Sequence, residues 1–278
     1  MNPQHITRAL RDNPQQAVAL IIGIISAIAT IIQIIQPPKE HTTPPITVNQ
    51  GDSIAIQRPD GSFGTCVIGY INHEKNIAYT AGHCAAEDEV QPLDPRTQTR
   101  DIITKGVTGA DIYTADASTH IGTVTRNGLY EAEGFGNHND WLEITLDPQT
   151  ATLGENVYSH NRTVDHTAIH PGDTYCMYVA TKNKTQCGFV VKATPSTIFA
   201  SPLHSGDQLG YPGDSSAPVW IERPDGSIKG FWGLHAKRIG LSISHTPGFE
   251  GEDKELHQPI HPDDIALAKH IYLNNHKG

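Results

Sequence analysis

From residue 50 onward the chain alternates short apolar runs with turn residues. Gly, Pro, Asn or Asp separates each run from the next, and this pattern of many short strands predicts an all-β barrel or sandwich. The motif I-x-R-P-D-G-S occurs at 56–62 and again at 221–227, as expected for similar hairpins in two similar barrels. The apolar runs are SIAIQ (53–57), TCVIGYI (65–71), NIAYTA (76–81), WLEITL (141–146), NVYSH (156–160), GFVVKA (188–193), SAPVWI (216–221) and IKGFWGLHA (228–236).

The C-terminus has a helical pattern. Within HPDDIALAKHIYLNN, Pro262 suits the first turn of a helix, and the aspartates that follow it suit the positive end of the helix dipole. We therefore expect a helix at about 262–275 that packs on the β domain. Its apolar face would consist of Ile265, Leu267, Ala268, Ile271 and Leu273.

The N-terminus has an uncharged apolar segment at 17–36, AVALIIGIISAIATIIQIIQ, followed by two prolines. A helix of this length spans a hydrocarbon core, and Arg8 and Arg11 before it favour an N-terminus left in the cytoplasm. The segment is thus predicted to be a hydrophobic helix that anchors the chain in the cell membrane. The alternative is a cleaved signal peptide of a secreted protein, because Ala27-Ile28-Ala29 resembles a cleavage site.

Four regions follow from these patterns. Residues 1–16 form an N-terminal tail, 17–36 the anchor or signal segment, 37–49 a proline-rich linker, and 50–278 the folded domain. The formal net charge is −10, and the first 49 residues carry three basic and two acidic residues, so the folded domain is acidic. An acidic domain repels phosphate backbones, which argues against nucleic acid as a partner.

The four cysteines are Cys66, Cys84, Cys176 and Cys187. None forms a C-x-x-C pair, which argues against a zinc ribbon. Four cysteines allow three disulfide pairings, and the simplest one joins near neighbours in the sequence. Disulfides would indicate an oxidising compartment, in agreement with the export segment.

Three separated segments carry residues suited to nucleophilic catalysis: TAGHC (80–84), NDWLEITL (139–146) and GDSSAP (213–218). A serine hydroxyl is not ionised at neutral pH, so a base must take its proton during attack, and a carboxylate must orient that base. Small residues around Ser215 allow a turn to present its hydroxyl. No cofactor and no metal is needed for this chemistry, and none is expected.

Together the three segments resemble the motifs of the chymotrypsin-like (trypsin-like) serine proteases. GDSSAP agrees with G-D-S-G-G-P at four of six positions, and the resemblance extends over about 50–260. CMYVATKNKTQCG (176–188) is similar to a cysteine loop common in the bacterial branch of that family. The resemblance implies two six-stranded antiparallel Greek-key barrels, at about 50–150 and 151–258. It also implies the disulfides Cys66–Cys84 and Cys176–Cys187.

The family's roles carry over to matching residues. Ser215 would be the nucleophile, His83 the general base and then acid, and Asp140 the carboxylate that orients His83. The N–H groups of Gly213 and Ser215 would form the oxyanion hole. The substrate would be a protein or peptide. Two other carboxylates compete with Asp140 for this role, namely Asp111 and Asp116.

The substrate pocket would be lined by Leu209 and by the strand that carries His235, Ala236 and Lys237. An apolar floor at Leu209 disfavours cleavage after lysine or arginine. GLHA (233–236) resembles a stretch of glutamyl endopeptidases on this fold, in which a histidine contacts the substrate carboxylate. Cleavage would then follow an acidic side chain. If His235 instead packs inside the barrel, cleavage would follow small or medium apolar residues.

The sequence departs from the family pattern at the nucleophile. Ser216 and Ala217 replace two glycines, and a non-glycine residue after the nucleophile can shift the turn. No I-V-G-G start follows a basic residue, so Asp214 would pair with a cation other than a new N-terminus. Ser216 leaves a catalytically inactive binding module as the alternative function.

Two other enzyme classes fit less well. An α/β-hydrolase needs G-x-S-x-G and the order Ser, Asp, His, and the sequence shows neither. A zinc enzyme is suggested only by the closeness of His160, His166 and His170 in the sequence. H-E-x-x-H is absent, and the spacing of these histidines fits no helix face.

Overall fold

The computed structural model describes residues 44–90, 102–131, 139–158, 162–204, 206–223, 229–239, 241–249, 253 and 258–277. The N-terminal tail, the apolar segment 17–36 and most of the linker lie outside these ranges. Over the ranges given, no helix combines the length and apolar character needed to cross a membrane. The 3₁₀ helices are η1 (Gly82–Ala85), η2 (His166–Ala168) and η3 (Ala180–Lys182).

The first half of the folded domain is a seven-stranded antiparallel sheet with the order β3-β2-β8-β9-β11-β5-β4. Its edge strands β3 and β4 are joined by two residues only, Ile68 and Gly69, so the sheet curls back toward itself. The strands are β2 (Ser53–Gln57), β3 (Phe63–Val67), β4 (Tyr70–Asn72), β5 (Ile77–Thr80), β8 (Asp111–Thr114), β9 (His120–Asn127) and β11 (Leu142–Leu146).

The expected six-stranded first barrel is therefore wrong in strand number and in closure. The free edge of β3 hydrogen-bonds to the turn that carries Ser215, where the Val67 N–H donates to the Ser215 carbonyl at 3.0 Å. A strand whose edge groups are satisfied by another segment has no need to close a ladder with its neighbour. Isoleucine and valine side chains of the sheet fill its concave side, among them Ile54, Ile121 and Ile144.

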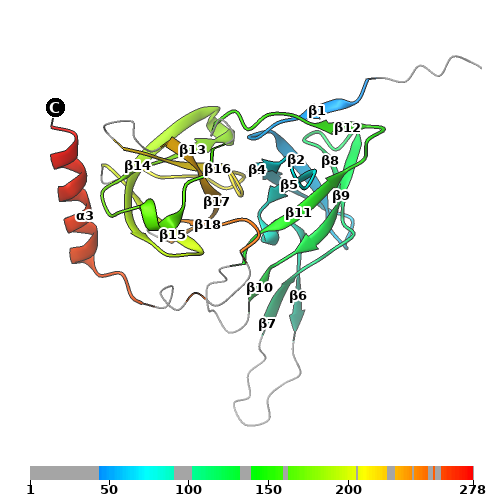
Figure 1. Ribbon diagram of the computed structural model, residues 1–278. Coiled ribbons are helices and arrows are strands. Elements are labelled where there is room, and N and C mark those ends of the chain that lie inside the picture. The colour runs from blue at the N-terminus through cyan, green and yellow to red at the C-terminus, as the bar shows by residue number, and fades with distance from the viewer. Residues whose placement is uncertain are drawn as a thin grey trace, which may run out of the picture. The chain divides into compact units, whose positions relative to one another are not determined.

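Two small sheets extend this half. β6 (Ala86–Val90), β7 (Ile102–Gly106) and β10 (Tyr130–Glu131) form a three-stranded sheet, and β1 (Ile46–Val48) pairs in parallel with β12 (Ala151–Leu153). The β6–β7 pair projects away from the seven-stranded sheet (Figure 1). The apolar pattern did not predict β6, whose sequence AEDEV is mostly acidic.

The apolar run at 156–160 is not a strand where the structure describes it, at 156–158. This segment connects the two halves, and hydrogen bonds attach it to residues of the first half. Asn156 accepts a hydrogen bond from the Ile71 N–H at 2.9 Å and donates one to the Ile71 carbonyl at 2.8 Å. The Tyr158 N–H donates to the Gln50 side chain at 3.0 Å. Each of these contacts thus uses one side chain, of Asn156 or of Gln50, and not a backbone ladder.

The second half is a closed six-stranded barrel, as expected. The strand order β16-β13-β14-β15 places the fourth strand beside the first, which is the Greek-key arrangement, and β18 and β17 close the circle. Its core includes Met177, Val190 and Trp232. The strands are β13 (Thr174–Val179), β14 (Lys184–Ala193), β15 (Thr197–Pro202), β16 (Pro218–Glu222), β17 (Lys229–Ile239) and β18 (Leu241–His245).

The C-terminal helix α3 (Pro262–Asn275) confirms the expected element, and it lies along β14 (Figure 1). Ala268 is fully buried against Phe189 and Val191 of that strand. The predicted apolar face is wrong at two positions, because Leu267 and Leu273 are exposed. The helix contacts the barrel along a narrower stripe than its sequence suggests.

Candidate active site

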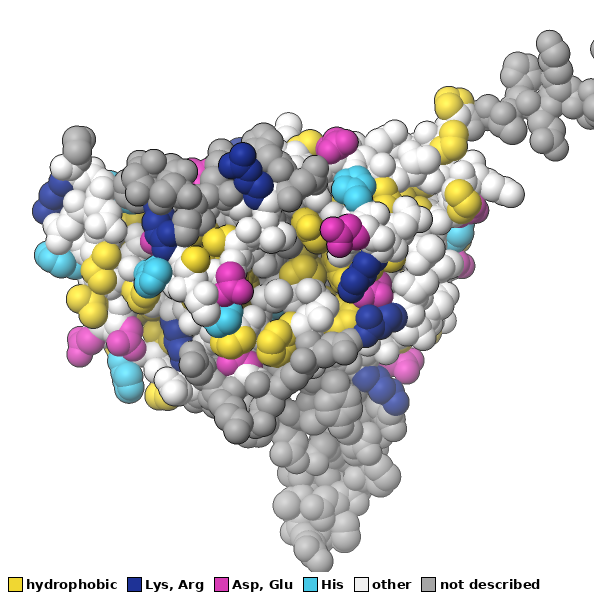
Figure 2. All heavy atoms as spheres, in the orientation of Figure 1, with side chains coloured by type: hydrophobic (Ala, Val, Ile, Leu, Met, Phe, Trp, Pro, Cys, Tyr) yellow, Lys and Arg dark blue, Asp and Glu magenta, His cyan; other side chains and the backbone are white. Residues whose placement is uncertain are grey.

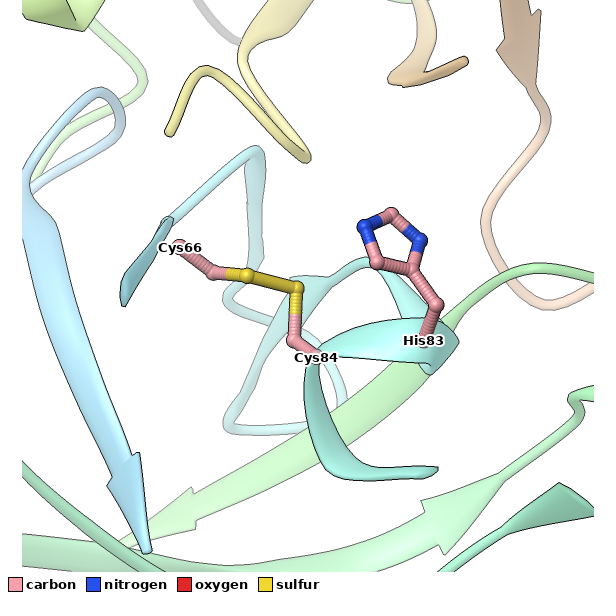
Figure 3. A group of neighbouring side chains, drawn as sticks. All are labelled: Cys66, His83 and Cys84. Carbon is pink, nitrogen blue, oxygen red and sulfur yellow. A yellow bond between two sulfur atoms is a disulfide. The ribbon is translucent and has the colours of Figure 1, made fainter. Parts of the chain in front are cut away.

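His83 lies on η1, directly after β5. Cys84 on the same short helix is joined to Cys66 of β3, so the helix is tied to the sheet beside the histidine (Figure 3). In chain-entropy terms, closing a loop of this length stabilises the fold by about 3 kcal/mol. The ring of His83 and the two sulfur atoms lie within 4.8 Å of one another. The sulfur atoms are bonded to each other, so they are not thiolates that could hold a metal ion.

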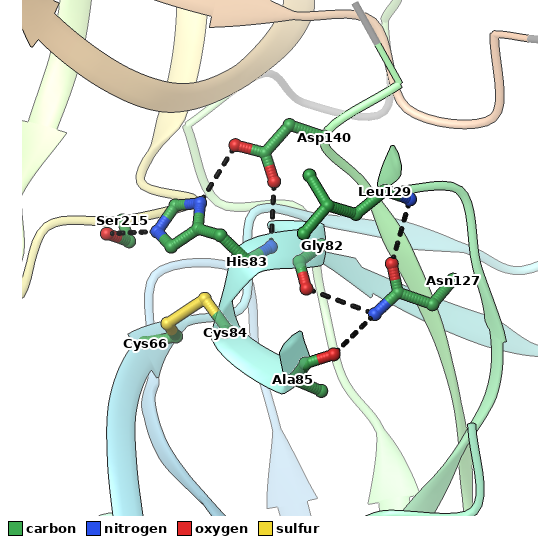
Figure 4. A network of polar contacts seen from close by, with 9 residues as sticks. All are labelled: Cys66, Gly82, His83, Cys84, Ala85, Asn127, Leu129, Asp140 and Ser215. Carbon is green, nitrogen blue, oxygen red and sulfur yellow. Dashed lines mark hydrogen bonds and ion pairs between the residues drawn. A yellow bond between two sulfur atoms is a disulfide. The ribbon is translucent and has the colours of Figure 1, made fainter. Parts of the chain in front are cut away.

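A second group, the side chain of Asn127, holds η1 in place, and it is not predicted from the sequence. The Asn127 side-chain amide donates to the carbonyls of Gly82 at 3.0 Å and Ala85 at 2.9 Å, and its oxygen accepts the Leu129 N–H (Figure 4). One side chain thus satisfies backbone groups at both ends of the short helix. An asparagine at the end of a strand gives no sequence signal for a partner more than forty residues away.

Asp140 precedes β11 and makes two hydrogen bonds to His83. One carboxylate oxygen accepts the His83 backbone N–H at 2.8 Å, and the other lies 2.8 Å from Nδ1 of the ring. The competing carboxylates have other partners: Asp111 pairs with His120, and Asp116 accepts hydrogen bonds from Thr114 and Ser118. The structure therefore brings Asp140 to His83, and not Asp111 or Asp116.

Asp140 is ionised at neutral pH. Burial alone would raise the pKa of its carboxyl, but the charge and the hydrogen bonds of His83, with a further attraction from His245, hold the pKa at about 2. An ionised carboxylate accepts hydrogen bonds only, so Nδ1 of His83 carries a proton. In the neutral ring, Nε2 is then the basic atom.

Ser215 lies on the opposite side of the imidazole from Asp140. Its Oγ is 2.9 Å from Nε2 of His83, so Ser215, His83 and Asp140 form one line of contacts (Figure 4). His83 and Asp140 come from the first half of the domain and Ser215 from the second. With Nε2 unprotonated, the arrangement is suited to remove the proton from the serine hydroxyl.

The turn at 213–216 shows how the chain accommodates a serine at the glycine position. Gly213 and Ser216 both have positive φ, +94° and +72°. The Ser216 N–H donates to the His235 carbonyl at 2.6 Å, which fixes the turn to β17. The Ser216 hydroxyl is buried and has no hydrogen-bond partner among the described residues. The turn is therefore kept, at the cost of an unfavourable backbone angle for a serine.

Among the described residues, Asp214 has neutral hydrogen-bond donors as partners, and not the cation expected from the sequence. Its fully buried carboxylate accepts hydrogen bonds from the backbone N–H groups of Thr181 at 2.9 Å and Tyr211 at 2.8 Å, and from the Thr181 hydroxyl. These three neutral donors compensate for the burial of the carboxylate, because hydrogen bonds from backbone N–H groups and hydroxyls stabilise a charged carboxylate. The second disulfide, Cys176–Cys187, joins paired residues of β13 and β14 and confirms the predicted pairing.

Two of the predicted pocket residues are buried. Leu209 packs in the apolar core of the barrel, and His235 is 4% exposed. Nδ1 of His235 lies 3.1 Å from Ser242 Oγ, and a Cβ on Gly210 would lie 2.5 Å from Nε2. Only glycine leaves room for the imidazole there. Ala236 is half-buried, and Lys237 has its backbone in β17 while its side chain lies outside the described atoms.

The His235 ring is backed by further buried hydroxyl groups. Ser242 Oγ lies 3.0 Å from the Tyr175 hydroxyl, which in turn lies 2.8 Å from Ser244 Oγ. The described members of the histidine group considered for zinc are elsewhere and bonded to other side chains. His166 pairs with Asp165, and His170 lies beside Asp173 and Arg223, while His160 lies outside the described residues.

On the face of the molecule shown in Figure 2, acidic, basic and histidine side chains are interspersed. The described side chains on this face do not gather into one patch of a single charge. A continuous basic stripe is the usual footprint of a nucleic-acid interface. This face carries no such footprint among its described side chains.

The comparisons with known proteins find similar solved structures. The chain is similar to the thermostable serine protease AL20 from an extremophilic microorganism, at 11% identity, 82% of this chain, 97% of that one and a TM-score of 0.35. It is also similar to kallikrein-related peptidase 10 in a complex with Zn²⁺, at 14% identity over 71% of this chain and 89% of that one, with a TM-score of 0.34. The scabies mite inactivated protease paralogue S-I1 is similar at 13% identity over 70% of this chain and 89% of that one, with a TM-score of 0.36. No family model and no curated protein matches. At this distance the likeness says nothing about the activity of this chain.

Replacing Ser216 by glycine is expected to stabilise the fold. The change removes a positive-φ serine, which costs roughly 1–2 kcal/mol, and a buried hydroxyl without a partner. The greater chain entropy of glycine in the unfolded state offsets part of this gain, so we expect a net increase of about 1 kcal/mol in the unfolding free energy. Urea denaturation measures the change.

The matched control is Ala217→Gly, at the next residue, whose φ is not positive. It is expected to lower the unfolding free energy by about 1 kcal/mol, because it removes a buried methyl group and adds chain entropy. Destabilisation by both substitutions would show that the turn at Ser216 is not strained.

Proposed function

We propose that this protein is a serine endopeptidase that hydrolyses peptide bonds through an acyl-enzyme. The observation that carries the proposal is the line of contacts Ser215–His83–Asp140, with 2.9 Å and 2.8 Å between the interacting atoms. A serine, an imidazole and a buried ionised carboxylate in this order form a nucleophile, its base and the group that orients the base.

In the first half of the reaction, the Ser215 oxygen attacks the carbonyl carbon of the peptide while its proton passes to Nε2 of His83. Asp140 stabilises the resulting imidazolium and keeps the ring oriented. The tetrahedral intermediate collapses when the bond to the leaving nitrogen breaks and that nitrogen takes the proton from His83. A water molecule then attacks the acyl-enzyme while it gives a proton to His83. When the bond between the acyl carbon and the Ser215 oxygen breaks, that oxygen takes the proton back from His83, and the acid is released.

The oxyanion of the intermediate would be stabilised by the backbone N–H groups of Gly213 and Ser215. Within the described part of the chain, neither group donates to a protein acceptor. The positive φ of Gly213 belongs to the same turn that presents Ser215. Donors fixed by the backbone need no reorganisation when negative charge develops, which is what an oxyanion hole requires.

The alternative function is a catalytically inactive binding module, and the strained Ser216 is the observation in its favour. The strain has not moved the neighbouring hydroxyl out of reach, since Ser215 Oγ remains 2.9 Å from His83. The endopeptidase is therefore the better supported function. A reagent that phosphonylates activated serines separates the two, because only an activated Ser215 reacts.

We further propose that the endopeptidase cleaves after acidic side chains, although His235 is almost fully buried in the barrel, because Nε2 of its ring lies on the side of Gly210. The imidazole of His235 lies against Gly210, in the segment just before the nucleophile, and Ser242 and Tyr175 back it from the other side. A substrate carboxylate bound at this imidazole would gain a charge-assisted hydrogen bond. Leu209, which is apolar, contributes no charge of either sign to this region.

Both disulfides support a location in an oxidising compartment, and all four cysteines are paired. We infer that the protein is exported and that its folded domain acts outside the cytoplasm. The segment 17–36 is proposed to direct this export as a membrane anchor.

The change Ser215→Ala is expected to lower kcat for a cleaved peptide by about 10⁶-fold while the circular dichroism spectrum stays that of the wild type. Without the hydroxyl there is no acyl-enzyme, and only binding and the oxyanion donors remain. The neighbouring variant Ser216→Ala is the matched control and should keep its activity, because the Ser216 hydroxyl has no partner among the described residues. More than a few per cent of wild-type activity in Ser215→Ala would exclude the proposed nucleophile.

Acidic specificity is tested with peptides that differ only in Glu, Leu or Lys before the cleaved bond. The wild type should show a kcat/KM for Glu at least about tenfold above that for Leu, which corresponds to roughly 1.4 kcal/mol. His235→Gln should remove this preference, and His120→Gln, a histidine paired with Asp111 elsewhere, should keep it. A wild-type preference for Leu, or an unchanged ratio in His235→Gln, contradicts the proposal.

Export is tested by fractionating cells that produce the full chain. The protein is expected in the membrane fraction, accessible to protease added from outside, with both disulfides found by peptide mapping without reduction. A soluble extracellular product that begins near Thr30 would show a cleaved signal peptide, and a cytoplasmic protein with free thiols would contradict export.

A further inference from the structure

The connection between β13 and β14 reaches the turn that carries Ser215, and the proposed reaction does not use it. The two strands pair without interruption, so only residues 180–183 join them. η3 occupies most of this connection, and Asn183 ends it with a positive φ of 48°, a conformation that asparagine tolerates. The Cys176–Cys187 disulfide crosslinks the same two strands. The tip of the hairpin is therefore short, and its base is fixed.

Thr181, at this tip, contacts two consecutive residues of the turn before Ser215. Its N–H donates to Oδ1 of Asp214 at 2.9 Å, and its hydroxyl donates to Oδ2 at 3.2 Å. A Cβ built on Gly213 would lie 3.1 Å from the Thr181 methyl carbon, so this methyl group lies against Gly213. Beside it, the Lys182 ammonium lies 5.2 Å from the centre of the Tyr211 ring. The tip of the hairpin thus meets the turn through several groups.

Asp214 depends on these donors because its carboxylate is fully buried. A buried charged group is costly unless hydrogen bonds compensate for the loss of water. Of its three described donors, the Tyr211 N–H at 2.8 Å comes from the same segment, three residues earlier. A donor within the turn moves with the turn. The two donors of Thr181 are the ones that tie the carboxylate to a different part of the barrel.

We propose that Thr181 is a positioning residue for the oxyanion hole, a role that rests on the proposed endopeptidase function. Asp214 lies between Gly213 and Ser215, whose N–H groups would stabilise the oxyanion. With Asp214 bonded to Thr181 and Gly213 packed against it, both N–H groups keep their direction while negative charge develops. A threonine therefore takes the place of the cation that the sequence led us to expect beside Asp214.

This arrangement requires a carboxylate and does not accept its amide. A backbone N–H faces each oxygen of Asp214, from Thr181 at Oδ1 and from Tyr211 at Oδ2. The NH₂ group of an asparagine would meet an N–H donor in either orientation of the amide. Asp214→Asn is thus expected to release the side chain from Thr181, although it changes almost no volume.

The deciding experiment probes the oxyanion site with a peptidyl trifluoromethyl ketone, labelled with ¹³C at its carbonyl. The Ser215 oxygen bonds to the carbonyl carbon, the proton of Ser215 passes to His83, and the carbonyl oxygen becomes an oxyanion that takes up a proton at lower pH. N–H groups directed at this oxygen favour its charged form and lower the pKa of the hemiketal hydroxyl. The ¹³C shift, followed against pH, gives this pKa.

In the full chain with Thr181→Ala, the pKa of the hemiketal hydroxyl should rise by about one unit. Thr181→Val keeps the methyl contact and loses only the hydroxyl, so it should raise this pKa by less. Thr181 is itself exposed, so neither change disturbs the apolar core. Thr185→Ala, at an exposed position of the same hairpin, is the matched control and should leave the pKa unchanged. An unshifted pKa in Thr181→Ala overturns the proposal.

Kinetics then tests whether Thr181 acts through Asp214. For Thr181→Ala we expect kcat to fall about tenfold with KM unchanged, because oxyanion donors act on the transition state. In the background of Asp214→Asn, the same substitution should lower kcat less than about twofold further, since the link is already broken. Effects that multiply in the double variant would contradict the assignment.

Hydrogen exchange tests the role of Thr181 without any catalysis. The Asp214 N–H donates to the Tyr211 carbonyl and the Ala217 N–H to the Asp214 carbonyl, both at 2.9 Å, so their protection reports the order of the turn. Thr181→Ala should speed their exchange at least about tenfold, and Thr185→Ala should not. A wild type that forms no hemiketal contradicts the endopeptidase function alone, whereas unchanged exchange in Thr181→Ala overturns the role of Thr181.

Discussion

The pair of hydrogen bonds between Asp140 and His83 is the constraint on which the candidate site depends. One bond fixes the backbone of η1 and the other fixes the ring, so a single carboxylate sets both the position and the orientation of the imidazole. The same two bonds lower the pKa of Asp140 against the effect of its burial. An ionised Asp140 in turn requires the proton on Nδ1, which leaves Nε2 directed at Ser215. The geometry and the electrostatics of the site therefore have one origin.

Around this pair, the fold restrains each end of η1 separately. The Cys66–Cys84 disulfide ties the helix to β3, and Asn127 satisfies backbone carbonyls at both ends of it. A 3₁₀ helix of four residues has too few internal hydrogen bonds to hold a side chain precisely by itself. The disulfide, Asn127 and the bond from the His83 N–H to Asp140 are three attachments that replace the stability the helix lacks.

The sequence predicted those features that are encoded locally. The strand-rich pattern, the C-terminal helix and the cysteine pairing are confirmed because each depends on residues close together in the chain. The first barrel was expected with six strands, but its sheet has seven, and the edge of β3 bonds to the Ser215 turn. The strand β6, in a separate small sheet, was not predicted because its sequence is acidic and does not alternate. Asp214 was expected beside a cation and instead accepts N–H groups from Thr181 and Tyr211. Such contacts are made by backbone groups, which almost every residue type carries, so the sequence does not indicate them.

Each half of the domain supplies only part of the candidate site, so the site depends on how the two halves are held together. The first half holds His83 and Asp140, and the second presents Ser215, whose carbonyl accepts the Val67 N–H of β3. A small displacement between the halves would lengthen the Ser215–His83 contact, since the two residues share no segment of chain. Apolar packing of Leu234 against Trp141 joins the halves but does not fix a direction. Directed contacts such as Val67–Ser215 and Trp141–Phe249 do, because a hydrogen bond weakens steeply when its angle changes. The site thus needs polar contacts between the halves as much as it needs its own three side chains.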